Sequence, residues 1–234
     1  MAAAQVLAFS SSRVGEGAYL ENAVPVIEKL LGKEEKTIAF IPFASVDDYG
    51  EYLEKVRKAL SATPYKVEGV TPANAKELIA SSNAIMVGGG NTFKLLHDLY
   101  ESDLVRLIKE KVQNGTPYIG WSAGSNLTGP TICTTNDMPI LEPKSFFCFG
   151  FFSFQINPHY YNLVIEGFHG ETRDQRLEEY LKANPGKKII ALPEGTWLQL
   201  QDQTITFNGI AQGVLMSREE GQTIHRIIEP GTTL

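Results

Sequence analysis

Short apolar runs alternate with longer amphipathic segments along the first half of the chain. Runs of mostly aliphatic and aromatic residues predict strands at 5–9, 37–43, 65–70, 84–90 and 117–120. Apolar residues that recur every three to four positions predict helices at 19–32, 47–62, 74–82, 91–99 and 102–113. This alternation predicts an α/β fold with a doubly wound, mostly parallel sheet. The strands lack apolar–polar alternation, as expected for a sheet covered by helices on both faces.

The pattern changes after residue 130. Residues 131–156 are rich in aromatics and predict extended, loop-rich structure, and residues 172–183 predict a further helix. From residue 195 onward, short strand-like runs alternate with turn residues, which predicts a C-terminal β-hairpin or meander. No linker or low-complexity tract divides the chain, so we expect a single α/β domain over residues 1–234.

Composition and charge narrow the classes of partner. Hydrophobic residues make up 43% of the chain and its formal net charge is −6, which argues against nucleic acid as a partner. There is no apolar run near twenty residues and no basic segment ahead of a short apolar one, so we expect no membrane partner and a cytoplasmic location. Metal-ligand, P-loop and dinucleotide patterns are absent, so no metal or cofactor is predicted. No oligomeric state is predicted.

The strand at 117–120 runs into GWSAG, residues 120–124, which has the form G-x-S-x-G. In this pattern a serine lies on a tight turn between strand and helix, where its hydroxyl is exposed for nucleophilic attack. The glycines of residues 88–90 follow another strand and therefore lie on the same sheet edge. Backbone amides of Ala123 and of Gly89 or Gly90 could then stabilise an oxyanion. Alternatively, Ser122 caps a helix.

A serine nucleophile needs a base, and the chain has four histidines. His159 follows an apolar run and a proline, which places it at a strand end and makes it the best candidate. The alternative is a structural histidine packed against Tyr160 and Tyr161. His97, His169 and His225 lie in a helical pattern, a loop and a tail strand.

A carboxylate should orient the imidazole, and two are suitably placed. Asp137 lies in TTNDMPI, where it could equally form a turn, and Glu194 lies in ALPEGTW, where it could equally cap or pair with a base. Position slightly favours Glu194, because we expect the strand before it to belong to the main sheet.

Six motifs in order give this sequence a resemblance to a known family. They are VGGGNTFKLL, YIGWSAGSN, TTNDMPI, QINPHYYN, GETRDQR and LPEGTW, within residues 39–197. Together they resemble the α-aspartyl dipeptidases, or peptidase E. The resemblance implies a fold like that of class I glutamine amidotransferases, no metal, and hydrolysis of Asp-Xaa dipeptides by Ser122 with His159 as base. Asp137 and Glu194 both match motif positions, so the third catalytic member stays open.

An N-terminal aspartate presents a carboxylate and an ammonium group. Arg173, in GETRDQR, is the predicted ligand of the carboxylate, because guanidinium groups bind carboxylates in a bidentate fork. Its alternative role is a surface ion pair with Glu171 or Asp174. Glu171, or whichever of the two acids does not orient the histidine, could bind the ammonium group.

Two other functions remain open from the sequence. One is a cyanophycinase-like serine hydrolase that acts on another aspartyl bond. The other is a non-catalytic module that binds an anionic metabolite at GGGNT, where a helix begins.

Overall fold

A seven-stranded sheet forms the centre of the computed structural model, which describes residues 3–163, 166–167 and 169–234. The strand order is β3-β2-β4-β5-β1-β8-β9. The parallel strands are β1 (Val6–Phe9), β2 (Lys36–Ile41), β3 (Tyr65–Gly69), β4 (Ala84–Val87) and β5 (Tyr118–Trp121). The hairpin of β8 (Thr196–Gln201) and β9 (Thr204–Gly209) adds to the edge of β1 in antiparallel orientation. The predicted doubly wound, mostly parallel sheet is confirmed.

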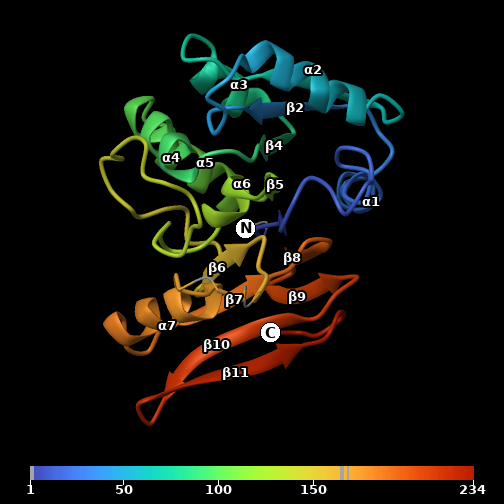
Figure 1. Ribbon diagram of the computed structural model, residues 1–234. Helices are drawn as coiled ribbons and strands as arrows, with labels where there is room; N and C mark the ends of the chain where they lie inside the picture. Colours follow the sequence, from blue (N-terminus) through green and yellow to red (C-terminus); the bar gives the residue numbers. More distant parts are fainter. Residues whose placement is uncertain (1–2, 164–165, 168) are drawn as a thin grey trace.

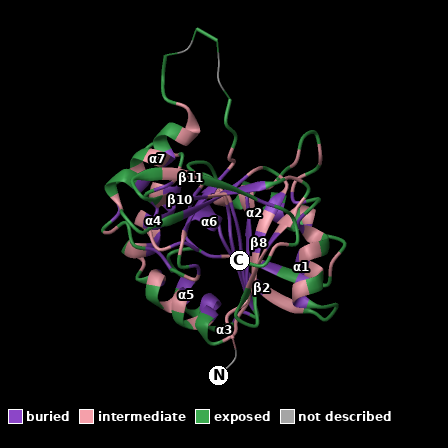
Figure 2. Ribbon diagram, turned by 90° about the horizontal axis from the view of Figure 1, so that it is seen from below, coloured by how far each residue is buried: buried purple, intermediate pink, exposed green. Residues whose placement is uncertain are grey.

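Helices cover both faces of this sheet, and the strands between them are buried (Figures 1 and 2). On one face, α1 (Val24–Leu31) and α2 (Tyr49–Ala59) pack their buried side chains against the strands. On the other face lie α3 (Ala75–Ser81), α4 (Thr92–Glu101) and α5 (Leu104–Gln113). No helix in the described part of the chain is long and apolar enough to cross a membrane.

Helix α1 begins five residues later than its apolar pattern predicts, at Val24 rather than residue 19. Pro25 is the reason. Proline has no N–H to donate and its ring clashes with the preceding turn, so it is tolerated only in the first turn of a helix. The residues ahead of it form turns, in which Leu20 has a φ of 58°.

A second, four-stranded sheet has the order β11-β10-β7-β6 (Figure 1). It consists of β6 (Gln155–Pro158), β7 (Lys188–Leu192), β10 (Gly213–Glu219) and β11 (Gln222–Ile228), and α7 (Arg173–Ala183) packs on it. The predicted C-terminal hairpins are present. Our assignment of the strand before Glu194 to the main sheet is wrong, because β8 occupies the free edge of β1 and β7 pairs with β6 and β10 instead.

The two sheets are joined at Ser10, which directly follows β1 and is fully buried. Its hydroxyl donates to the carbonyl of Leu192 at the end of β7 (2.7 Å) and accepts the backbone N–H of His159 after β6 (2.9 Å). The carboxyl ends of β1, β6 and β7 therefore meet at one place, although they belong to different sheets, and the end of β5 lies beside that of β1.

Candidate active site

Ser122 lies on the turn between β5 and the short helix α6 (Ala123–Asn126), with φ 53° and ψ −112°. The glycines of its motif are required by close approach. A Cβ at Gly120 would lie 2.6 Å from the carbonyl oxygen of Gly124, and a Cβ at Gly124 would lie 2.2 Å from that of Val87. The Ser122 side chain makes no capping hydrogen bond. Its strained backbone instead turns the hydroxyl out of the helix, as in a nucleophile elbow.

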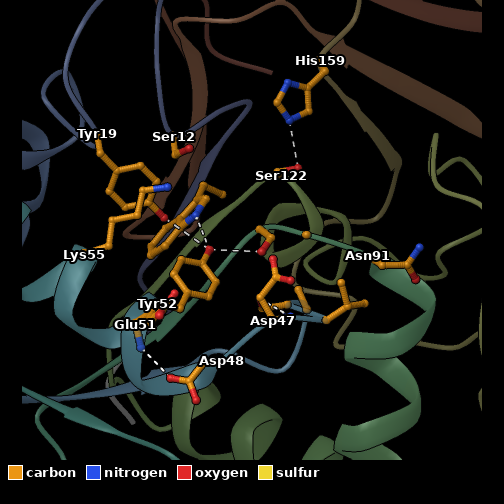
Figure 3. Close-up of a pocket in the computed structure, with 16 residues that line it drawn as sticks. Ser12, Tyr19, Asp47, Asp48, Glu51, Tyr52, Lys55, Asn91, Ser122 and His159 are labelled. Atoms are coloured by element: carbon orange, nitrogen blue, oxygen red, sulfur yellow. Dashed lines mark hydrogen bonds between the residues drawn. The ribbon is translucent and has the colours of Figure 1, made fainter.

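His159 contacts both Ser122 and a carboxylate. Its Nε2 lies 2.9 Å from Ser122 Oγ, and its Nδ1 lies 2.9 Å from Glu194 Oε1 (Figure 3 shows the first of these contacts). Serine, imidazole and carboxylate therefore form a continuous chain of hydrogen bonds, with the geometry by which a base activates a hydroxyl. Ser122 comes from the main sheet, whereas His159 and Glu194 follow strands of the second sheet.

Asp137, the other predicted acid, is engaged elsewhere. Its Oδ2 accepts the backbone N–H of Thr92 (2.7 Å), the Thr92 hydroxyl (2.5 Å) and the Thr135 hydroxyl (3.1 Å). It thus lies at the N-terminus of α4, where the helix dipole stabilises a negative charge. The Nδ1 of His159, which either acid could have held, is bonded to Glu194.

The remaining histidines have other partners. His97 bonds to Asp98 within α4 (2.9 Å), and His225 on β11 lies within 3.6 Å of Asp174 and Glu178 on α7. His169 is exposed. None of these three is among the residues that line the cleft at Ser122.

Arg173 is the first residue of α7, directly after a capping box formed by Thr172 and Gln175. Its guanidinium lies over the ring of Tyr161, 5.3 Å from the ring centre. Burial lowers the pKa of this guanidinium, while Tyr161 and the nearby Asp137 carboxylate act in the opposite direction. Its Nη1 is buried and has no hydrogen-bond partner among the described residues. A buried donor without an acceptor is uncommon.

The alternative ion pairs considered for Arg173 do not form in the described part of the chain. Glu171 is exposed and pairs with Arg176 (3.6 Å). Asp174 accepts hydrogen bonds from the Tyr160 hydroxyl (2.7 Å) and from Asn162 (2.6 Å). The assignment of Glu171 to the substrate ammonium stays a prediction, and the structure gives it a partner on the surface.

A cleft of about 510 Å³ opens at Ser122 and His159 (Figure 3). Gly89 lies against Ser122, since a Cβ at Gly89 would be 3.0 Å from Ser122 Cβ. No described hydrogen bond uses the backbone N–H of Gly89, Gly90 or Ala123, so all three predicted oxyanion donors are available. The cleft is also lined by four charged residues and two tyrosine rings: Asp47, Asp48, Glu51, Lys55, Tyr19 and Tyr52.

Sequence reasoning missed two residues at this site. Ser10 holds the backbone of His159, whose φ is 52°. The only signal for Ser10 is a polar residue directly after a buried strand. Tyr52 contacts the glycine turn from α2, and nothing in its local sequence indicates this role. No group of three or more side chains suited to a metal occurs among the described residues.

Fold and site together are those of a hydrolase of the serine type, because a serine, a histidine and a carboxylate are joined by hydrogen bonds at the carboxyl ends of strands. The family model of peptidase family S51 matches residues 6–208, and the chain belongs to this family of serine peptidases. It is 50% identical over 206 residues to peptidase E of Nostoc sp. PCC 7120, covering 87% of this chain and 85% of that one. It is 45% identical over 216 residues to peptidase E of Shewanella sp. ANA-3, covering 92% and 91%.

Two solved structures share the fold. A structure assigned to peptidase E from Listeria monocytogenes EGD-e superimposes with a TM-score of 0.71 at 23% identity, over 90% of this chain and all of that one. A peptidase from an acI-B1 Actinobacterium gives a TM-score of 0.71 at 19% identity, over 99% and 96%. At these identities the likeness supports the fold alone.

Proposed function

We propose that this serine peptidase hydrolyses dipeptides with an N-terminal aspartate. The observation that carries the proposal is Arg173, a half-buried cation whose Nη1 has no partner among the described residues and whose pKa the charge of the Asp137 carboxylate raises. A guanidinium and a carboxylate in one region suit the two charges of an N-terminal aspartate, its β-carboxylate and its α-ammonium. The name of the curated relatives, peptidase E, agrees with this substrate class.

In the proposed mechanism Ser122 attacks the carbonyl carbon of the aspartyl residue. His159 accepts the hydroxyl proton through Nε2 and returns it to the leaving amine, and Glu194 holds Nδ1 and stabilises the imidazolium. The amide of Ala123 and an amide of the Gly89–Gly90 turn bind the oxyanion. Water then hydrolyses the acyl-enzyme by the same proton route in reverse.

The two acids have different roles in this proposal. Glu194 serves the imidazole, and Asp137 is left to bind the α-ammonium of the substrate. Asp137 and Arg173 lie outside the residues that line the cleft at Ser122. We propose that the leaving residue occupies this cleft and that the aspartyl residue binds toward Asp137 and Arg173. We further propose that the whole chain acts as one domain in the cytosol, where its two free cysteines, Cys133 and Cys148, stay reduced.

Release of free aspartate from Asp-Leu tests this proposal, with Ala-Leu and β-Asp-Leu as control substrates and Ser122→Ala as the control enzyme. We expect turnover of Asp-Leu far in excess of the slow turnover of Ala-Leu and β-Asp-Leu, and its loss in Ser122→Ala. Turnover of β-Asp-Leu in preference to Asp-Leu would favour the cyanophycinase-like alternative. Binding of Asp-Leu by the folded wild type without turnover would favour the non-catalytic module.

A further inference from the structure

Tyr52 on α2 is held in a network of three hydrogen bonds at the wall of the cleft (Figure 3). Its oxygen accepts from Trp121 Nε1 (3.2 Å) and from the Tyr19 hydroxyl (3.3 Å). Its own proton goes to the carbonyl of Gly89 (3.1 Å). Because both acceptor sites of the phenol oxygen are occupied, its proton has one direction left, toward Gly89.

The peptide between Gly89 and Gly90 has no side chain on either side to fix its orientation. Gly90 has a φ of 137°, in a region that residues with a Cβ rarely adopt. Glycine populates such regions as readily as ordinary ones, so the φ and ψ preferences of these two residues do not fix the orientation of this peptide. A flipped peptide would direct the Gly89 carbonyl, rather than the Gly90 N–H, to the side that faces away from Tyr52. An interaction from outside the turn must select between the two orientations.

We infer that Tyr52 is a positioning residue for the oxyanion hole. Its hydroxyl holds the Gly89 carbonyl, and because a trans peptide directs its C=O and N–H to opposite sides, the Gly90 N–H points away from Tyr52. Gly89 lies between Tyr52 and Ser122, so this orientation keeps the carbonyl oxygen out of the space where a substrate oxyanion forms. The inference rests on the proposed hydrolysis through Ser122, and it identifies the hydrogen bond that keeps the Gly90 N–H available to the oxyanion.

A second observation supports the fit between Tyr52 and the turn. A Cβ at Gly88 would lie 2.5 Å from the Tyr52 hydroxyl oxygen. Glycine at position 88 therefore leaves the room that the hydroxyl needs to reach the next residue. Burial raises the pKa of Tyr52 above its ordinary value, so the phenol remains a donor throughout the physiological range.

Tyr52→Phe removes the hydroxyl and keeps the ring. Gly88→Ala keeps the tyrosine at position 52 but displaces its hydroxyl, because the added Cβ would overlap with it. Tyr65→Phe is the matched control, because the Tyr65 hydroxyl also donates to a glycine carbonyl, that of Gly32, at the far edge of the sheet. The net free energy of one hydrogen bond changes the ratio of the two peptide orientations by up to about tenfold. We expect both site variants to lower kcat for Asp-Leu by about tenfold with KM nearly unchanged, since an oxyanion donor acts mainly in the transition state.

The second measurement does not depend on the substrate. A fluorophosphonate labels the site when Ser122 Oγ displaces fluoride from phosphorus and gives its proton to His159, while the phosphoryl oxygen occupies the oxyanion hole. We expect the labelling rate of Tyr52→Phe and Gly88→Ala to fall about as much as kcat. Crystals of Tyr52→Phe should show the Gly89–Gly90 peptide flipped or in two orientations.

The outcomes separate the inference from the proposed function. A wild type that is labelled but leaves Asp-Leu intact would refute the aspartyl substrate, and the labelling rates would still test Tyr52. Labelling of Tyr52→Phe at the wild-type rate would overturn the inference, as would an equal loss in Tyr65→Phe. A wild type that resists labelling would overturn both.

Discussion

Replacing each of the two acids in turn tests the division of labour between them. Glu194→Gln keeps the length of the side chain and an oxygen that can accept from His159 Nδ1, but removes the charge that stabilises the imidazolium. Asp137→Asn likewise keeps an acceptor for the backbone N–H of Thr92 and removes the charge proposed to bind the substrate ammonium. Both changes are nearly isosteric, so the fold should survive them.

The contact distance and exposure set the expected size of the Glu194 effect. Two unit charges about 4 Å apart attract each other by about 1 kcal/mol in water and about 4 kcal/mol near a protein surface. The Glu194 side chain is 53% exposed, so solvent screens the attraction and the lower half of this range applies. A loss of about 1–2.5 kcal/mol corresponds to a fall in kcat of about 5- to 70-fold. This is less than the ~10⁴-fold effect of the comparable change where the acid is buried.

The Asp137 variant should behave differently, because an ammonium is bound equally in the ground state and in the transition state. We expect Asp137→Asn to raise KM for Asp-Leu by about tenfold and to change kcat by less than about threefold. Succinyl-leucine, which lacks the ammonium group, is the matched substrate and should lose nothing in this variant. Steady-state release of leucine measures both effects.

The opposite pattern would refute this assignment. If Asp137→Asn abolished kcat and left KM unchanged while Glu194→Gln resembled the wild type, Asp137 would have to reach His159 in the working enzyme. If Asp137→Asn raised KM equally for Asp-Leu and succinyl-leucine, Asp137 would not bind the ammonium group, and the assignment of Glu194 would be unaffected.

Three further predictions follow from the same structure. Ser10→Ala leaves the part-buried N–H of His159 without its partner and removes one of the two donors to the Leu192 carbonyl. It should cost about 1–3 kcal/mol in urea unfolding, and its kcat should fall more than its KM rises; an unchanged kcat would show that His159 is held without it. Arg173→Ala should raise KM for Asp-Leu but not for Ala-Leu, and equal effects would exclude a carboxylate ligand. Burial raises the pKa of the Cys148 thiol, so a disulfide reagent at pH 8 should titrate only the exposed Cys133 in the native protein and both thiols in urea.

The main sheet could be predicted because short stretches of sequence determine each of its strands and helices. Each parallel strand is an apolar run of a few residues, bounded by turn residues and followed by an amphipathic helix, and these patterns do not depend on distant parts of the chain. The one large boundary error, at α1, comes from a single residue, Pro25, whose effect on the preceding turn outweighs the apolar periodicity.

The second sheet could not be predicted in the same way. Strand β7 is as apolar as any strand of the main sheet, and its burial pattern gives no indication of which neighbours it pairs with. The pairing is decided by competition for an edge, since β8 already occupies the position beside β1. Such competition depends on contacts between segments far apart in the chain, which local patterns do not record.

The same distinction applies to the site. The sequence identifies Ser122 because glycines flank it, and these glycines are required by close approaches at Gly120 and Gly124 within the turn itself. The acid stays open from the sequence because Asp137 and Glu194 both match motif positions of the family, and only the packing of two sheets determines which oxygen reaches Nδ1. Tyr52 left no signal, because its partner lies on another element.

This division of the site between two sheets has a consequence for its stability. Ser122 is fixed by β5, whereas His159 and Glu194 follow β6 and β7, so the distance from Ser122 to His159 depends on how the sheets meet. Ser10 ties the two sheets at this point, with one hydroxyl that contacts both β6 and β7 ends. A change at Ser10 that loosens the contact between the sheets should therefore reduce the activity before it unfolds either sheet. A change in the turn at Ser122 should instead reduce the activity and the stability of the main sheet together.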